Sequence, residues 1–171
     1  GDVYKRQAQG ARVGILDADI YGPSVPHMLG APHQRPTSPD NQHITPIKAH
    51  GLSANSIGFL MDEDNATIWR GPMASSALSQ LLNETLWDSL DYLVIDMPPG
   101  TGDIQLTLSQ QIPVTGAVVV TTPQDIALLD AVKGVSMFER VSVPVLGIVE
   151  NMSMHICSNC GHHEAIFGTG G

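Results

Sequence analysis

The sequence predicts an α/β fold, in which a mostly parallel sheet carries helices on both faces. Short runs rich in Val, Ile and Leu alternate with longer segments whose apolar residues recur at helical spacing. The short runs are apolar at consecutive positions, which is typical of parallel strands that are covered by helices. With 171 residues, 42% of them hydrophobic and 15% charged, the chain is long enough for one domain with a buried core.

In the first half of the chain, a loop and a hairpin separate the expected elements. Residues 20–40 are rich in Pro and Gly and predict a long loop with one helical turn near 25–29. Two short strands around Gly51 predict a hairpin, and Pro72 opens a segment with helical spacing. The elements expected here are a helix end at Gly10, strands over 12–16, 44–48 and 52–57, and a helix over 72–86.

The second half alternates regularly between strand and helix. Residues 117–121 contain three consecutive valines, and Ile126, Leu129 and Val132 repeat at helical spacing. The elements expected here are strands over 92–95, 117–121 and 145–149, and helices over 103–110 and 125–138.

Polar residues follow several of these strands directly. Ligands of open parallel sheets bind beyond the carboxyl ends of the strands, so these residues would share one edge. They are Asp17 and Asp19, Asp96, Thr121 and Thr122, and Asn151.

Asp96 begins the segment Asp-Met-Pro-Pro-Gly-Thr-Gly-Asp. A carboxylate at a strand end can organise Mg²⁺ in a nucleotide-hydrolysing enzyme, and Gly100 would let the backbone approach the γ-phosphate. It is equally consistent that Asp96 only ends a strand and that Asp103 caps the next helix.

Asp17 and Asp19 are two apart in an extended segment, so their side chains point to opposite faces. One could bind a metal ion through water and the other could orient an attacking water, although an Asp-rich turn is the simpler interpretation. Asn151 could read a purine edge with its amide, or could merely end a strand in a turn.

Cys157 and Cys160 are the only cysteines, and their CxxC spacing predicts a metal or redox site. Two thiolates can hold a soft metal ion or one edge of an iron–sulfur cluster, but a complete site needs about four ligands. A zinc site would recruit His155, His162 or His163. A redox pair would stand at a helix N-terminus, for which the sequence here is poor. A cluster shared between two subunits needs only two cysteines from each.

Composition argues against several classes of function. The net charge of −9, with only 8 Lys and Arg, argues against a nucleic-acid surface. No apolar run reaches the roughly 18–20 residues that span a bilayer. Two cysteines are too few for a secreted disulfide scaffold. We therefore expect a cytoplasmic protein without nucleic-acid or membrane partners.

Several segments together resemble the Mrp/ApbC-type iron–sulfur cluster carrier ATPases, within the MinD/ParA-like branch of P-loop NTPases. The matching segments follow the family's order over nearly the whole chain beyond residue 8. They are Ile-Leu-Asp-Ala-Asp-Ile-Tyr-Gly-Pro-Ser at 15–24, Trp-Arg-Gly-Pro-Met at 69–73, Asp91 to Asp103, Thr-Thr-Pro-Gln at 121–124, Gly-Ile-Val-Glu-Asn-Met-Ser at 147–153 and Cys-Ser-Asn-Cys-Gly at 157–161.

The resemblance implies an ATPase that uses ATP and Mg²⁺. Asp19 would be the switch-I aspartate that activates water, and Asp96 would take the Walker-B position. The implied nucleotide and magnesium contacts are Asp17 in the magnesium shell, Gly100 in switch II, and Pro123 and Asn151 at the adenine.

The resemblance also implies the cargo and the partners. Cys157 and Cys160 would bind a [4Fe–4S] cluster that bridges a homodimer, and apo iron–sulfur proteins would receive it.

One motif of the family has no counterpart in this sequence. The glycine-rich P-loop with its lysine is missing, since Gly168–Gly171 follows no strand and contains no Lys. We expect an N-terminally truncated chain that lacks the first strand and binds ATP poorly. Residues 1–7 would be a non-native scar, and residues 8–171 a single partial P-loop NTPase-like domain with a metal-binding segment at 155–163.

Two other functions remain open. A ParA/MinD-like positioning ATPase would bind no metal and leaves the CxxC pair unexplained. A zinc-stabilised structural domain would bind one zinc ion per monomer with a histidine ligand.

Overall fold

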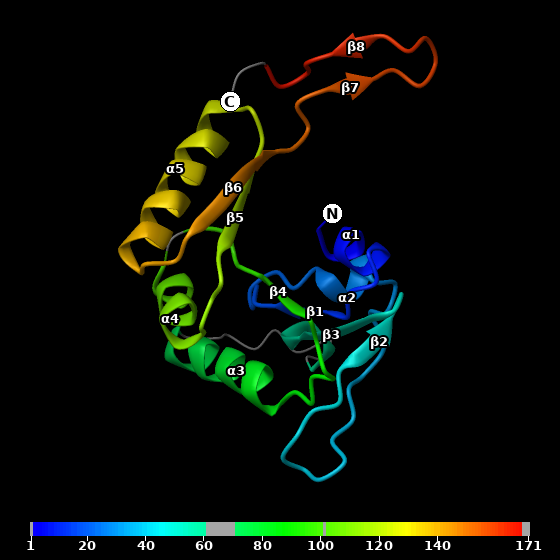
Figure 1. Ribbon diagram of the computed structural model, residues 1–171, viewed down its shortest axis with the longest axis vertical. Helices are drawn as coiled ribbons and strands as arrows, with labels where there is room; N and C mark the ends of the chain where they lie inside the picture. The colour runs from blue at the N-terminus through cyan, green and yellow to red at the C-terminus, as the bar shows by residue number, and fades with distance from the viewer. Residues whose placement is uncertain (1, 61–70, 101, 169–171) are drawn as a thin grey trace. The chain divides into compact units, whose positions relative to one another are not determined.

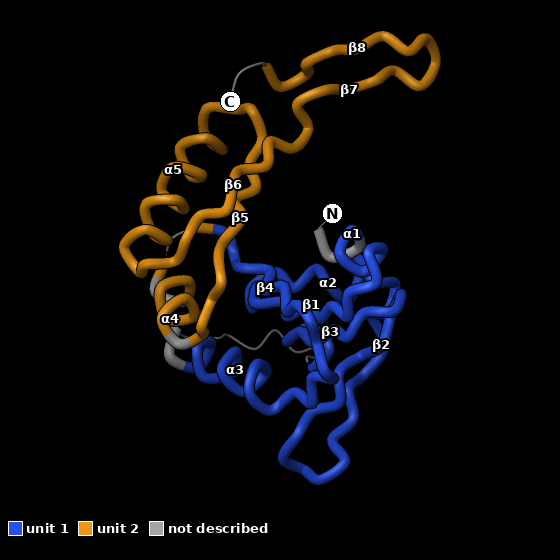
Figure 2. Tube along the Cα trace, in the orientation of Figure 1, with its two compact units in different colours: residues 1–99 blue, residues 100–171 orange. Residues whose placement is uncertain are grey.

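A computed structural model describes residues 2–60, 71–100 and 102–168. Trp69 and Arg70, which belong to one of the matching segments, lie outside these residues. The chain divides into two compact units, residues 1–99 and 100–171 (Figure 2). Its fold is α/β with mostly parallel pairing, as predicted, and the strands in the described residues are divided among three sheets. No helix in the described part of the chain is long and apolar enough to cross a membrane.

The first unit contains a four-stranded sheet in the order β2-β3-β1-β4. Strand β1 pairs in parallel with both β3 and β4, and β2 pairs antiparallel with β3 to form the hairpin predicted at Gly51. The elements of this unit are α1 (Asp2–Ala8), β1 (Val13–Asp17), α2 (Val25–Met28), β2 (Ile47–Ala49), β3 (Leu52–Ser56), the 3-10 turn η1 (Ile57–Phe59), α3 (Gly71–Glu84) and β4 (Tyr92–Asp96) (Figure 1).

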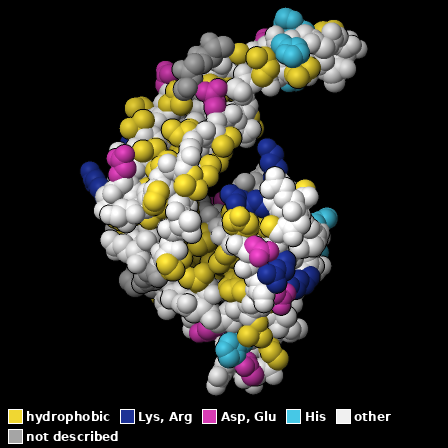
Figure 3. Space-filling model, in the orientation of Figure 1, with side chains coloured by type: hydrophobic (Ala, Val, Ile, Leu, Met, Phe, Trp, Pro, Cys, Tyr) yellow, Lys and Arg dark blue, Asp and Glu magenta, His cyan; other side chains and the backbone are white. Residues whose placement is uncertain are grey.

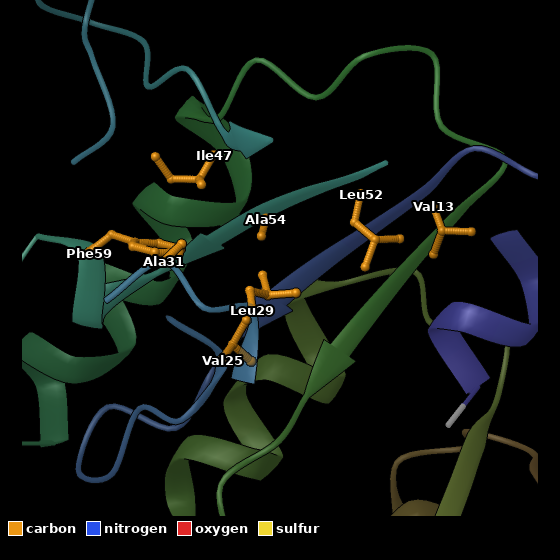
Figure 4. Packing of buried hydrophobic residues seen from close by; sticks show 8 residues of the cluster. All are labelled: Val13, Val25, Leu29, Ala31, Ile47, Leu52, Ala54 and Phe59. Carbon is orange, nitrogen blue, oxygen red and sulfur yellow. The ribbon is translucent and has the colours of Figure 1, made fainter. Parts of the chain in front are cut away.

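Strand β1 lies at the centre of this unit's core. On one face, Val13 belongs to a cluster of eight buried residues contributed by β1, β2, β3 and the segments around α2 and η1 (Figure 4). Next along the strand, Gly14 leaves room for neighbouring side chains, because a Cβ there would lie 2.5 Å from Leu90 Cδ1 and 3.1 Å from Leu93 Cδ1. Strand β1 is thus closely packed along the residues that lead to Asp17.

The second unit contains one parallel strand pair and a short hairpin. Helix α5 connects β5 to β6 and packs against both. The antiparallel pair β7–β8 continues the chain beyond β6 and carries the two cysteines in its turn (Figure 1). The elements of this unit are α4 (Asp103–Gln111), β5 (Ala117–Thr121), α5 (Asp125–Arg140), β6 (Val145–Glu150), β7 (His155–Ile156) and β8 (His163–Glu164).

Candidate functional site

The carboxyl ends of β1 and β4 bring three predicted site residues together. The two strands are parallel, and Asp17 is paired in register with Asp96. Just beyond β1, the Ala18 N–H donates to the Asp96 carbonyl oxygen at 2.9 Å. Asp19 therefore follows directly from a segment that is tied to β4.

The Asp17 carboxylate is fully buried and joins three elements. Its Oδ1 accepts the Asp19 N–H at 3.1 Å. Its Oδ2 accepts the Val25 N–H at 3.1 Å and the Ser56 hydroxyl at 3.0 Å. Burial raises the pKa of Asp17, these hydrogen bonds oppose that rise, and the charge of Asp96 adds to it. Asp17 thus fixes the loop between β1 and α2, and its predicted magnesium role stays a prediction.

Asp19 is held in a turn by its own loop. Its Oδ1 accepts the N–H groups of Tyr21 at 3.2 Å and Gly22 at 3.1 Å. This is the local hydrogen bonding by which Asp side chains stabilise turns, so the turn interpretation of the sequence describes its geometry. Such a turn also fixes the direction of a carboxylate, and the two interpretations are therefore compatible.

Asp96 has a raised pKa, first because it is partly desolvated and then because of the negative charge of Asp19. The two carboxylates are thus close enough to repel each other. A divalent cation relieves such repulsion, and Mg²⁺ prefers carboxylate and water oxygens. The arrangement of Asp96 and Asp19 is chemically suited to that ion.

In the second unit, Pro123 and Asn151 lie at adjoining strand ends. Strands β5 and β6 are in parallel register, with Thr121 opposite Glu150, and the Asn151 N–H donates to the Thr121 carbonyl oxygen at 2.7 Å. Pro123 is buried, whereas Asn151 is exposed and its Oδ1 accepts the Met152 N–H at 3.0 Å. The structure thus brings the two predicted adenine contacts to one edge, and their role stays a prediction.

Gly100 has a backbone conformation that favours glycine, with φ at +93°. Side chains other than glycine rarely adopt this left-handed region without strain. The glycine predicted here is therefore required by the local backbone, whatever ligand it approaches.

The cysteines occupy the turn of the β7–β8 hairpin. The Cys157 N–H donates to the His162 carbonyl at 2.9 Å, and the Gly161 N–H donates to the Cys157 carbonyl at 2.9 Å. Cys157 is half-buried and Cys160 is exposed, and both are free thiols. The backbone N–H groups of Cys160 and Asn159 lower the pKa of Cys157. Thiolates are the form that binds metals, so the turn is organised for ligation.

Histidines near this turn do not complete a metal site. In the described residues, no group of three His, Cys, Asp or Glu side chains is arranged to hold a metal ion. The hairpin register pairs His155 with Glu164 and Ile156 with His163. The zinc alternative, which needs histidine ligands beside the two cysteines, stays a prediction.

Ser56 is a site residue that sequence reasoning missed. It is fully buried at the end of β3, donates to Asp17 and accepts the Gly58 N–H at 3.0 Å. The only sequence signal is a polar residue at the end of a strand that is otherwise buried. Its hydrogen bond to Asp17 depends on the pairing of β1 with β3. The apolar pattern of one strand does not show which strand it pairs with.

Comparison with known proteins shows which family the chain belongs to. A family model described as ParA: NUBPL iron-transfer P-loop NTPase matches residues 4–171. The chain belongs to this family. The NUBPL-type assignment agrees with the resemblance found in the sequence, and it covers both the carboxylate cluster and the cysteine hairpin.

Curated relatives of this NUBPL-type chain carry closely related names. An iron–sulfur cluster carrier protein of Haemophilus influenzae is 96% identical over 165 residues, which are 96% of this chain and 45% of that protein. The carrier protein of Escherichia coli K12 is 77% identical over 96% of this chain and 44% of its own length. The iron–sulfur cluster transfer protein NUBPL of Mus musculus is 52% identical over 93% of this chain and 50% of its own length.

A solved structure has the same fold as this NUBPL-type chain. It is a nucleotide-binding protein from Archaeoglobus fulgidus in complex with ADP, with a TM-score of 0.82 and 38% identity over 98% of this chain and 65% of that one. The chain spans about half the length of the curated relatives it matches.

Proposed function

We propose that this chain is part of an ATP-dependent iron–sulfur cluster carrier. Its cargo is a [4Fe–4S] cluster, which it holds and then transfers to apo-proteins. The observation that carries the proposal is the hairpin turn, in which Cys157 and Cys160 are free thiols, in a chain 96% identical to a protein named as such a carrier.

The cluster is shared between two copies of the chain. A [4Fe–4S] cluster is held by about four thiolates, and one turn supplies Cys157 and Cys160 only. Since no third ligand is gathered beside them in the described residues, a second turn supplies the other pair. A homodimer with the cluster at its twofold axis satisfies this count.

Transfer proceeds by thiolate exchange without a change of oxidation state. An acceptor thiolate forms a bond to iron as the bond from iron to Cys160 or Cys157 breaks, and the freed thiolate takes up the proton that the acceptor thiol released. A turn in which one cysteine is exposed and the other half-buried lets an incoming thiol reach the cluster.

ATP hydrolysis belongs to the carboxylate edge of the first unit. Asp96 would hold Mg²⁺ through its water shell, and Asp19 would orient the attacking water. Asp17 would act mainly by fixing the loop that carries Asp19, because its oxygens accept three hydrogen bonds from the protein. Gly100 would approach the phosphates, and Pro123 with Asn151 would contact the adenine.

This chain on its own would bind ATP weakly. Its 171 residues contain no Gly-x-x-x-x-Gly-Lys-Ser/Thr segment, which in P-loop NTPases supplies the amide cradle and the lysine for the phosphates. Isothermal titration calorimetry with Mg²⁺–ATP should give little heat at micromolar protein. Tight binding that requires Mg²⁺ would contradict this expectation.

The carrier would work in the cytoplasm, where thiols stay reduced, and without nucleic-acid or membrane partners. Its free cysteine pair and its net charge of −9 support both points.

Anaerobic reconstitution with ferrous iron and sulfide tests the proposed cargo. The wild-type chain should gain a broad visible absorption band and about four iron atoms per two chains. The Cys157→Ala variant should lose both, whereas His162→Ala, a change in the same turn, should keep them.

The same experiment decides between the proposal and its alternatives. One zinc ion per monomer, lost in His155→Ala or His162→Ala, would replace the carrier by a zinc-stabilised domain. A chain that binds neither iron nor zinc would favour a positioning ATPase.

A further inference from the structure

The turn of the β7–β8 hairpin brings two sulfur atoms close together in one chain. Two backbone hydrogen bonds of 2.9 Å close the turn, from the Cys157 N–H to the His162 carbonyl oxygen and from the Gly161 N–H to the Cys157 carbonyl oxygen. The Cys160 thiol donates a hydrogen bond to the Cys157 sulfur, so the two side chains face each other. The turn therefore presents two soft donor atoms side by side.

The surroundings of the two sulfurs suit a complex with a single negative charge. The backbone N–H groups of Asn159 and Cys160 donate to the Cys157 sulfur, and such hydrogen bonds stabilise an anion. Residues 151–163 contain no Asp, Glu, Lys or Arg. Figure 3 shows hydrophobic and histidine side chains on the surface of the hairpin. Two thiolates with one monovalent cation have this charge, whereas two thiolates alone have twice as much.

The number of donors selects the ion. In the part of the chain that the structure describes, no third His, Cys, Asp or Glu side chain joins the two cysteines in a metal-binding group. A zinc ion or an iron–sulfur cluster takes about four ligands, so one turn leaves either of them incomplete. Thiolates are the soft ligands that select Cu(I). Because Cu(I) forms stable two-coordinate complexes with thiolates, one turn completes its coordination.

We propose that the cysteine turn of a single chain binds one Cu(I) ion between the sulfurs of Cys157 and Cys160. The inference goes beyond the proposed cluster cargo and does not depend on it. The ion arrives as a complex with two low-molecular-weight thiolates. Each sulfur of the turn forms a bond to copper as one of these thiolates leaves, and the leaving thiolate takes up the proton that the protein thiol released. Copper stays Cu(I), and no electron is transferred.

Copper and a cluster compete for the same two sulfurs. A chain that holds Cu(I) has no thiolate left for iron, so this ion prevents loading with a cluster. Cys160 is exposed and Cys157 is half-buried, so an excess of a small thiol reaches the ion and removes it by the reverse exchange. The block is therefore reversible.

Anaerobic titration of the reduced, metal-free chain with Cu(I) tests the proposal. Bicinchoninate, a coloured Cu(I) chelator, competes for the ion, and its absorbance reports how much copper the chain takes. The wild type should bind one Cu(I) per chain, and native mass spectrometry should show it on a monomer. Cys157→Ser and Cys160→Ser should each lower the affinity by more than about 100-fold, because changes outside the ligands already cost about 10–100-fold.

Ser158→Ala is the matched control. Ser158 lies between the two cysteines in the same turn and is no ligand of the proposed site. This variant should bind copper as the wild type does, and so should His162→Ala. X-ray absorption at the copper edge should show two sulfur neighbours. A nitrogen neighbour that is lost in His162→Ala would overturn the two-sulfur site.

Two further results would overturn the proposal. The first is one copper ion for every two chains, and the second is a Cys160→Ser variant with the affinity of the wild type. One equivalent of Cu(I) should also protect both cysteines from iodoacetamide, and unchanged alkylation would contradict the site. Failure of the carrier function looks different, since a copper-free chain that gains no iron–sulfur absorption band removes the cargo and leaves the copper titration unchanged.

Discussion

Strands β1 and β6 have similar apolar sequences and different surroundings. In β1, Val-Gly-Ile-Leu-Asp, only Ile15 is partly exposed, and β3 and β4 pair with the strand on either side. In β6, Val-Leu-Gly-Ile-Val-Glu, the side chains of Leu146 and Ile148 are 63% and 60% exposed. Among the described residues, β6 pairs only with β5. An apolar run thus specifies a strand, whereas the neighbours of that strand determine whether its side chains are buried.

The largest expected effect comes from truncating a leucine in each strand. Leu16→Ala should lower the free energy of unfolding by about 2–5 kcal/mol, since Leu16 is fully buried in β1. Leu146→Ala should change it by less than about 1 kcal/mol, because that side chain already contacts water. Urea unfolding followed by circular dichroism measures both. Equal losses would mean that β6 is covered in solution.

A glycine in each strand gives a smaller contrast. Gly14→Ala should destabilise by about 1–3 kcal/mol, because its Cβ would lie 2.5 Å from Leu90 Cδ1. At Gly147 of β6 no atom lies within 4 Å of an added Cβ, so Gly147→Ala should be neutral or stabilise by up to about 1 kcal/mol. Thermal unfolding compares the two variants. A destabilised Gly147→Ala protein would show a close neighbour on β6.

The elements of both units follow from local patterns. Residues 117–121 form the predicted strand with the same bounds, and the helix predicted over 125–138 extends to Arg140. The meeting of Asp17 with Asp96 follows from the rule that parallel strands end at one edge. These features depend only on residues that are close in sequence or on general properties of parallel sheets.

The remaining features depend on long-range placement. Ser56 reaches Asp17 across 39 residues through the register of β1 with β3. The division of the strands among separate sheets, and the hairpin register that pairs His163 with Ile156, are likewise set by pairing. The spacing of apolar residues in the sequence does not show which strands pair or in which register.

The carboxylates of the first unit should give a measurable pH dependence. The pKa of Asp96 is raised in the folded state, so the stability it contributes is fully present below its unfolded pKa of about 3.9 and is lost as pH rises through the folded value. Asp96→Asn removes this loss. The variant should therefore gain stability relative to the wild type as pH increases from about 4 to 7, which urea titrations at each pH would measure. A difference that does not change with pH would contradict the raised pKa of Asp96, which comes from its desolvation and from the charge of Asp19.

The pKa of Cys157, in the second unit, should be shifted in the opposite direction, to a lower value. Backbone N–H groups lower the pKa of Cys157, so its alkylation by iodoacetamide in a Cys160→Ser variant should have a midpoint pH below the value for the same thiol in the urea-unfolded chain. Mass spectrometry across pH follows the reaction. A midpoint at or above that value would show that these amides do not face the sulfur in solution.

The hydrogen bonds of Asp17 have a consequence for synthesis on the ribosome. Asp17 and Asp19 are made early, but Ser56 follows 39 residues later and Asp96 comes later still. A nascent chain that ends before β3 therefore lacks the Ser56 hydrogen bond, and Asp17 is held only by the N–H groups of Asp19 and Val25. The hydrogen-bond network around Asp17 is thus complete only after the pairing of β1 with β3 and β4 has formed.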